Sequence, residues 1–149
     1  MEQYNGPLRE VKDMVSYYSD SATMKLKMEA PILLEFESMD KEFPTGIYLE
    51  FYDKKGNIES TIEANYCYYY YSRNEYKATG DVVVKSIEPK QILSTEELFW
   101  NEKTAKIHTD KFVTIETEDQ IMMGTGLEAD QDFSTYTILK GSGNISLDN

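Results

Sequence analysis

The sequence predicts an all-β domain built from stacked antiparallel hairpins, and three observations support this fold class. Apolar and polar residues alternate strictly along several stretches, which is the period of a strand with one buried face. Short segments rich in turn-forming residues separate these stretches. Twelve tyrosines and six phenylalanines supply bulky side chains that suit pleated, half-buried strands. Strands at such short spacing indicate a sandwich, a jelly roll or an open barrel.

The chain starts with a segment that we expect to be flexible over residues 1–14, followed by one folded domain over residues 15–149. The stretch from Leu8 to Tyr18 is ambiguous. An irregular or edge strand is favoured there. The alternative is a helix, whose apolar face would consist of Leu8, Val11, Met14, Val15 and Tyr18.

The clearest strands lie between residues 24 and 68. Met24, Leu26 and Met28 alternate with two lysines, and Ile47, Leu49 and Phe51 alternate with Tyr48, Glu50 and Tyr52. A longer run places these side chains on one buried face: Ile58, Ser60, Ile62, Ala64, Tyr66 and Tyr68.

A weak repeat runs through the second half of the chain. Hairpins open near Ile62, Leu93 and Met122, and close near Gly80, Asp110 and Gly143. The closing positions are 30 and 33 residues apart (110 minus 80, and 143 minus 110). Because a single hairpin is not stable alone, the core must run continuously through the stack.

The composition argues against several classes of function. The formal charge is −12, which disfavours binding to nucleic acid or to anionic membrane surfaces. One cysteine, Cys67, allows no internal disulfide. No apolar run reaches the roughly 20 residues of a membrane span, and no signal-peptide pattern opens the chain.

Three short motifs suggest ligands but lack the context that each ligand requires. The run Gly124 to Ala129 fits a dinucleotide fingerprint, yet a turn rather than a helix follows it. Asp130, Asp132 and Ser134 have the opening spacing of a calcium loop, without its glycine and glutamate. His108 is the only histidine and shares a strand face with Asp110, so a surface histidine is favoured over a metal ligand.

Two rival functions come from carboxylates and tyrosines. Glu35 with Glu37, or Glu96 with Glu97, could supply the carboxylates of a hydrolase, although such pairs are expected by chance in an acidic chain. Tyr66 and the run 68–71 could form a stacking platform for sugars. A carbohydrate-binding jelly roll is therefore the main alternative to the function that follows.

Several stretches, in this order and spacing, resemble the LptC family, and the similarity covers roughly Val15 to Leu147. These stretches are residues 43–56, 80–84, 93–100, 106–113 and 124–129. The resemblance implies a twisted antiparallel β-jelly roll, an open two-sheet sandwich, in the periplasm. It also implies an anchor to the inner membrane through a segment that we expect to be missing from this chain.

The resemblance implies a non-enzymatic subunit of lipopolysaccharide export that needs no cofactor. Its expected partners are lipopolysaccharide, the permeases of an inner-membrane ABC transporter, and a periplasmic bridge protein of similar fold. The bridge protein is expected along Tyr136 to Leu147, the last strand pair, because few charges blunt that edge. The expected partner-binding residues are Gly124, Tyr136, Ile138, Gly143, Ile145 and Leu147.

A carrier of an acylated lipid needs a continuous apolar trough, because each CH₂ group exposed to water costs about 0.8 kcal/mol. A jelly roll that does not close fully offers such a trough between its sheets. Phe43 is expected near its mouth, since Pro44 ends strand pairing there. The expected lipid-binding residues are Met24, Leu26, Met28, Phe43, Ile47, Leu49, Phe51, Ile62, Val113 and Ile115.

Overall fold

The computed structural model describes residues 4–20 and 23–146, with side chains for 4–19 and 25–141. Its strands are all antiparallel. They are β1 (Arg9–Asp20), β2 (Thr23–Glu35), β3 (Lys41–Phe43), β4 (Ile47–Tyr52), β5 (Ile58–Ala64), β6 (Tyr66–Tyr70), β7 (Glu75–Ser86), β8 (Gln91–Asn101), β9 (Lys106–Glu116), β10 (Gln120–Asp130) and β11 (Tyr136–Ser146), with one 3-10 turn at Tyr71–Arg73. The predicted all-β jelly roll is confirmed.

The long strands bend in the middle and contribute to two layers. The C-terminal half of β7 pairs with β5, where Val84 lies opposite Ile62. Its N-terminal half pairs with β6, where Glu75 lies opposite Tyr70. Between the halves, Gly80 and Asp81 have φ angles of 83° and 46°. Such left-handed residues turn the strand from one layer into the other.

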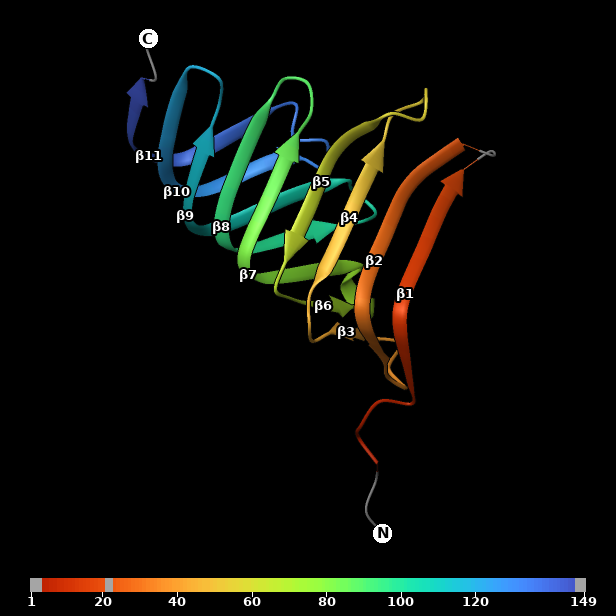
Figure 1. Cartoon of the computed structure of the whole chain (residues 1–149). Coiled ribbons are helices and arrows are strands. Elements are labelled where there is room, and N and C mark those ends of the chain that lie inside the picture. Colours follow the sequence, from red (N-terminus) through yellow and green to blue (C-terminus); the bar gives the residue numbers. More distant parts are fainter. Residues whose placement is uncertain (1–3, 21–22, 147–149) are drawn as a thin grey trace.

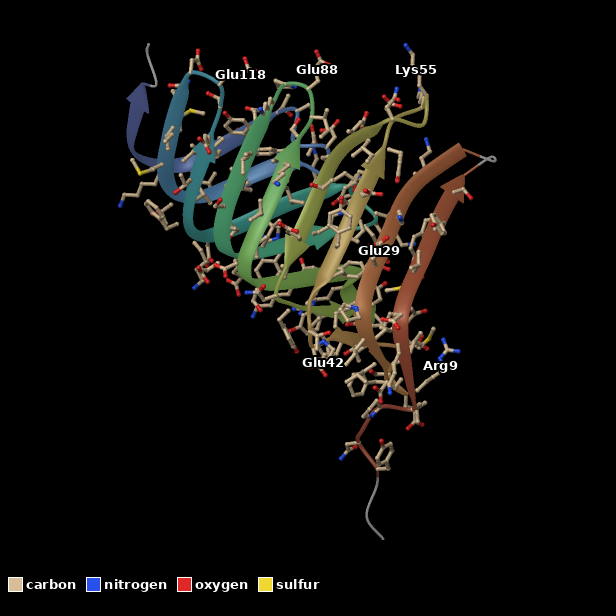
Figure 2. The ribbon with its side chains drawn as sticks, in the orientation of Figure 1. Arg9, Glu29, Glu42, Lys55, Glu88 and Glu118 are labelled. Atoms are coloured by element: carbon tan, nitrogen blue, oxygen red, sulfur yellow. The ribbon has the colours of Figure 1, made fainter. Side chains whose placement is uncertain are left out.

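Two layers therefore face each other and are joined along the line of bends (Figure 1). The first layer holds β4 and β5 with the adjoining halves of β7 to β10, and the second holds β3 and β6 with the other halves. On the side away from the bends, turns carrying Lys55, Glu88 and Glu118 line the tips of the first layer (Figure 2).

The core fills the space between the layers as one continuous cluster, as the stack of hairpins requires. Both layers contribute side chains with no exposed surface. These are Phe43, Val82, Val84, Leu93, Ile107, Val113, Ile115, Leu127 and Phe133.

The alternation predicted from Ile58 to Tyr68 is wrong beyond Ala64. The chain bends at Asn65, whose backbone N–H donates to the Gly80 carbonyl at 2.9 Å. The bend shifts the alternation by one residue, so that Cys67 rather than Tyr66 or Tyr68 faces the core.

At the N-terminus, the strand alternative for Leu8 to Tyr18 is confirmed. β1 pairs with β2 from Arg9 onwards, so part of the segment expected to be flexible lies in the sheet. β1 and β11 lie at opposite ends of the molecule (Figure 1) and form its two edges.

Candidate functional site

The residues expected to bind lipid gather between the two layers. Leu26 packs against the core cluster from a partly buried position. The side chain of Met24 lies outside the described side chains. The remaining eight lie within the cluster: Met28, Phe43, Ile47, Leu49, Phe51, Ile62, Val113 and Ile115.

Phe43 does not lie at a mouth of this interior, contrary to expectation. It has no exposed surface, and its ring lies 6.4 Å from that of Tyr76 between centroids. Pro44 does end β3, but β3 pairs with β2 and β6 beside the bends, so Phe43 points into the packed core.

A group of aromatic rings crosses the interior from one layer to the other. Trp100 in the second layer meets Phe51 in the first edge-on, with ring centroids 5.3 Å apart. Trp100 also stacks on Tyr76 at 4.6 Å, and Tyr76 lies 4.5 Å from Tyr69. Flat, apolar surfaces of this kind suit hydrocarbon chains and hold the two layers together.

The side opposite the bends is closed at one place by the loop between β10 and β11, residues 131–135. The loop is held to the second layer because the Gln131 N–H donates to the Ala105 carbonyl at 3.0 Å. It is held to the first layer because the Ser60 hydroxyl donates to the Gln131 carbonyl at 3.0 Å. The loop therefore bridges the two layers across the open side of the sandwich.

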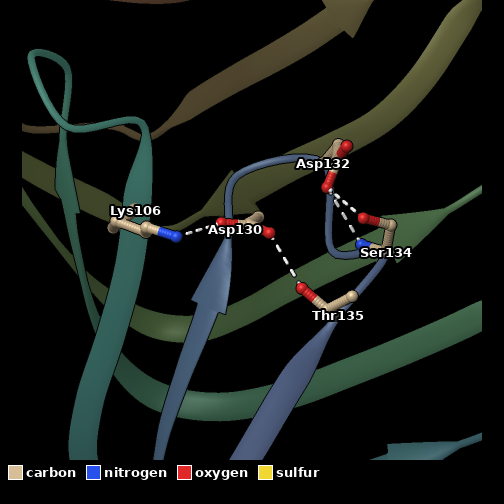
Figure 3. Close-up of polar contacts among 5 residues, drawn as sticks. All are labelled: Lys106, Asp130, Asp132, Ser134 and Thr135. Carbon is tan, nitrogen blue, oxygen red and sulfur yellow. Dashed lines mark hydrogen bonds and ion pairs between the residues drawn. The ribbon is translucent and has the colours of Figure 1, made fainter.

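Polar contacts fix the ends of this loop (Figure 3). Asp130 accepts from the Lys106 ammonium and, at 2.8 Å, from the Thr135 hydroxyl. Asp132 accepts from both the backbone and the hydroxyl of Ser134. These carboxylates shape the loop, which explains the spacing that resembled a calcium site.

Phe133 at the centre of the loop is a site residue that the sequence did not reveal. Its side chain is fully buried and stacks on Tyr136 with ring centroids 5.0 Å apart. Its neighbours in sequence are polar, so the segment has the composition of a solvated turn. An aromatic residue inside a turn was the available signal.

Two hollows adjoin the interior. One of about 580 Å³ lies between the turns that carry Glu88 and Glu118, and Gln91 and Tyr136 line it beside Asp119. Another, of about 730 Å³, lies at the bends, where Ile47 and Ala64 reach it from the core. Carboxylates also line that second hollow, which therefore repels phosphate groups. These carboxylates belong to Asp13, Glu29, Glu63 and Asp81.

The tyrosines that suggested a sugar platform divide between two faces. Tyr69 is buried, whereas Tyr66, Tyr68 and Tyr70 are half-buried on the outer face. The Tyr66 hydroxyl donates to Glu42 and the Tyr68 hydroxyl to Asp40. Desolvation and the bond to Asp40 raise the pKa of Tyr68 to about 12. The protein's own carboxylates thus already engage these hydroxyls.

The two edge strands differ in how strongly they are charged. β1 carries Arg9, Glu10, Lys12, Asp13 and Asp20, whereas β11 carries only Lys140. Charged side chains protect an edge from strand addition, so β11 is the less protected edge.

The residues expected to bind a partner lie on or against β11. Tyr136 and Ile138 are half-buried against the core, and the backbones of Gly143 and Ile145 pair with β10. Leu147 lies outside the described residues. Gly124 in β10 directly abuts β11: an added Cβ would meet the Ile138 side chain and lie 2.7 Å from the Lys140 carbonyl oxygen.

The other residues that the sequence suggested as ligand-binding or catalytic take part in contacts within the fold. Gly124 and Gly126 lie within β10, so no helix follows the dinucleotide fingerprint. His108 stacks on Phe99 with centroids 5.0 Å apart. Arg9 pairs with Glu35 at 2.6 Å. Among the described residues, no group of three or more His, Cys, Asp and Glu side chains could hold a metal ion.

No helix within the described ranges is long and apolar enough to cross a membrane. The family model described as "Lipopolysaccharide-assembly, LptC-related" matches residues 14–143. No curated protein sequence matches the chain.

Proposed function

From the membership of this chain in the LptC-related lipopolysaccharide-assembly family, we propose that it is a non-enzymatic periplasmic subunit of the lipopolysaccharide export machinery. It receives lipopolysaccharide from an inner-membrane ABC transporter and passes it to a periplasmic bridge protein of similar fold. The family match over residues 14–143 is the observation that carries this proposal.

The interior between the layers supports a role in carrying acyl chains. Side chains from both layers form one continuous apolar cluster that includes Leu49, Phe51 and Ile62. A twelve-carbon acyl chain in water costs on the order of 10 kcal/mol, at about 0.8 kcal/mol for each CH₂ group. The acyl chains displace part of this packing when they enter, and the sugars stay outside.

The unequal edges support a direction of transfer. The bridge protein adds a strand along β11, whose backbone is little protected by charge. The transporter permeases contact the end of the molecule that holds β1. A continuous apolar path between the layers then runs from one partner towards the other.

The domain works at the periplasmic side of the inner membrane. It provides binding sites rather than chemistry, and the transporter supplies the energy for lipid movement. Since affinity for a carried lipid must permit release, packing interactions without covalent capture suit this role.

Binding to matched ligands tests the proposal. The full chain should bind purified lipopolysaccharide, and mass spectrometry of lipid extracted from the purified protein should detect acylated glycolipid. The matched control ligand is the same lipopolysaccharide after chemical removal of its acyl chains, which should not compete. Equal competition by the deacylated sugar would contradict lipid carriage and favour the carbohydrate-binding alternative.

A further inference from the structure

Three buried hydrogen-bond donors in the apolar interior point at the same loop. They belong to Ser60, Gln91 and Trp100, which are 0%, 6% and 4% exposed. The Ser60 hydroxyl donates to the Gln131 carbonyl at 3.0 Å, and the Gln91 amide donates to the Phe133 carbonyl at 3.2 Å. The Trp100 indole donates to the Gln131 side-chain oxygen at 2.9 Å.

The loop presents to the interior the chemical features of an acyl group. The Phe133 ring is a hydrocarbon body with no exposed surface, and carbonyl oxygens flank it. All three core groups act as donors to the loop, and the three loop atoms that meet them are all acceptors. The pocket beneath the loop is therefore complementary to an apolar group that carries carbonyl oxygens.

We propose that Ser60, Gln91 and Trp100 form a binding site for the carbonyl oxygens of an acylated lipid, and that residues 131–135 occupy this site when no lipid is bound. The acyl chain replaces the Phe133 ring, and its ester or amide carbonyl replaces the loop carbonyls. This site rests on the proposed function, because it gives the three buried donors a role in recognising the carried lipid. A trough that bound only hydrocarbon would not need such donors.

Several features of the loop favour its displacement from the site. Phe133 has a φ of 55°, a left-handed conformation that costs a bulky residue free energy. The ion pair between Lys106 and Asp130 is exposed, with side-chain exposures of 61% and 38%. The hollow that Gln91 lines also reaches Tyr136, the residue that directly follows the loop.

Buried donors make the exchange selective. If the loop left and a plain hydrocarbon took its place, Ser60, Gln91 and Trp100 would lose their acceptors inside the apolar core. An unsatisfied buried donor is costly, whereas a lipid carbonyl restores the hydrogen bond. The site should therefore discriminate between an acyl ester and an alkyl ether of the same length.

The test compares two soluble probes with the full chain by calorimetry below their micelle concentrations. The probes are phosphatidylcholines with two six-carbon chains, joined by ester bonds in one and by ether bonds in the other, so that only the carbonyl oxygens differ. We expect the ester to bind about tenfold more tightly, the effect of one to two hydrogen bonds. Equal affinities would overturn the carbonyl site.

The single tryptophan of the chain, Trp100, reports the loop directly. Saturating ester probe should change its fluorescence, because its partner Gln131 moves away; unchanged fluorescence at saturation would contradict displacement of the loop. The double variant Ser60→Ala, Gln91→Leu should lose most of the ester preference, and Lys103→Ala in an exposed turn should keep it. Retention of the preference in a folded double variant would also overturn the site.

The outcomes separate this site from the proposed function. Binding of lipopolysaccharide without ester preference would leave lipid carriage standing and remove the carbonyl site. Failure of lipopolysaccharide and of both probes to bind would overturn the lipid-carrying function and this site with it.

Discussion

The indole nitrogen of Trp100 donates a hydrogen bond of 2.9 Å to the side-chain oxygen of Gln131 and so ties the second layer to the loop that closes the sandwich. Trp100 also meets Phe51 of the first layer edge-on. One side chain thus contacts the loop and both layers. The state of the loop and the packing of the interior are therefore coupled.

The buried ring of the loop should contribute strongly to stability. Phe133→Ala removes a fully buried side chain, and we expect it to lower the free energy of unfolding by about 3 kcal/mol, from lost burial and the cavity left behind. Urea unfolding followed by circular dichroism measures this. Ile87→Ala, at a residue 55% exposed, is the control and should change stability by less than about 0.5 kcal/mol. Equal effects of the two variants would show that Phe133 does not anchor the loop.

Gly124 should tolerate no side chain, because β11 approaches it closely. Gly124→Arg would push bulk and charge into Ile138 and the Lys140 carbonyl, so we expect a lower Tm and faster hydrogen exchange in β11. Gly141→Ala is the matched control, since an added Cβ there meets nothing within 4 Å. An unchanged Tm and unchanged exchange in Gly124→Arg would refute the close approach.

Acid should weaken the loop through Asp130. Hydrogen bonds from Lys106 and Thr135 lower the pKa of its carboxyl. Because the folded value lies below the unfolded value of about 3.9, the carboxylate stabilises the fold above about pH 4. That stabilisation is lost as the pH falls through the folded value. Urea midpoints between pH 2.5 and 6 should therefore drop less steeply towards acid in Asp130→Asn than in the native chain.

Glu59 provides a control, because its effect on stability should change with pH in the opposite direction to that of Asp130. Desolvation, with smaller effects of Asp132 in the loop and of Asp53, raises the pKa of its carboxyl. The protonated form is favoured in the fold, so this contribution is present at low pH and is lost as the pH rises through the folded value. Glu59→Gln should accordingly relieve a penalty at pH values above the folded pKa of this carboxyl. The same direction of change in both variants would contradict these assignments.

Sequence patterns predicted the strands well but not the places where the chain changes layer. The alternation of apolar and polar residues identifies β4 because this strand lies in one layer throughout. Its inward side chains, such as Leu49, therefore all point from the same face. It fails at Asn65 because a bend resets which side chains face inwards. Such bends depend on backbone geometry that alternation does not encode.

The loop was missed because its contacts are distant in sequence. Ser60 and Gln131 are 71 residues apart, and Gln91 and Phe133 are 42 apart. The local composition of residues 130–135 is that of a solvated turn, and only the arrangement of the layers makes Phe133 a core residue. The resemblance identified the family to which the chain belongs, and the structure was needed to find the polar groups inside the domain.

Strand addition at β11 should depend on its backbone rather than on its side chains. Ser146→Pro removes one backbone donor near the end of β11 and should weaken binding of a bridge protein of similar fold by about tenfold. Ser146→Thr keeps the donor and should bind like the native chain. Biolayer interferometry with immobilised bridge protein measures both, and undiminished binding by a folded Ser146→Pro variant would rule out this edge.

The proposal that acyl chains lie between the layers is tested most directly by photo-crosslinking to lipopolysaccharide. A photoreactive phenylalanine analogue replaces either Phe51, which faces the interior, or Tyr52, the next aromatic residue on the same strand, which is half-buried on the outer face. We expect crosslinked lipopolysaccharide from position 51 and little from position 52. Equal crosslinking at both positions, or crosslinking from position 52 alone, would contradict carriage between the layers.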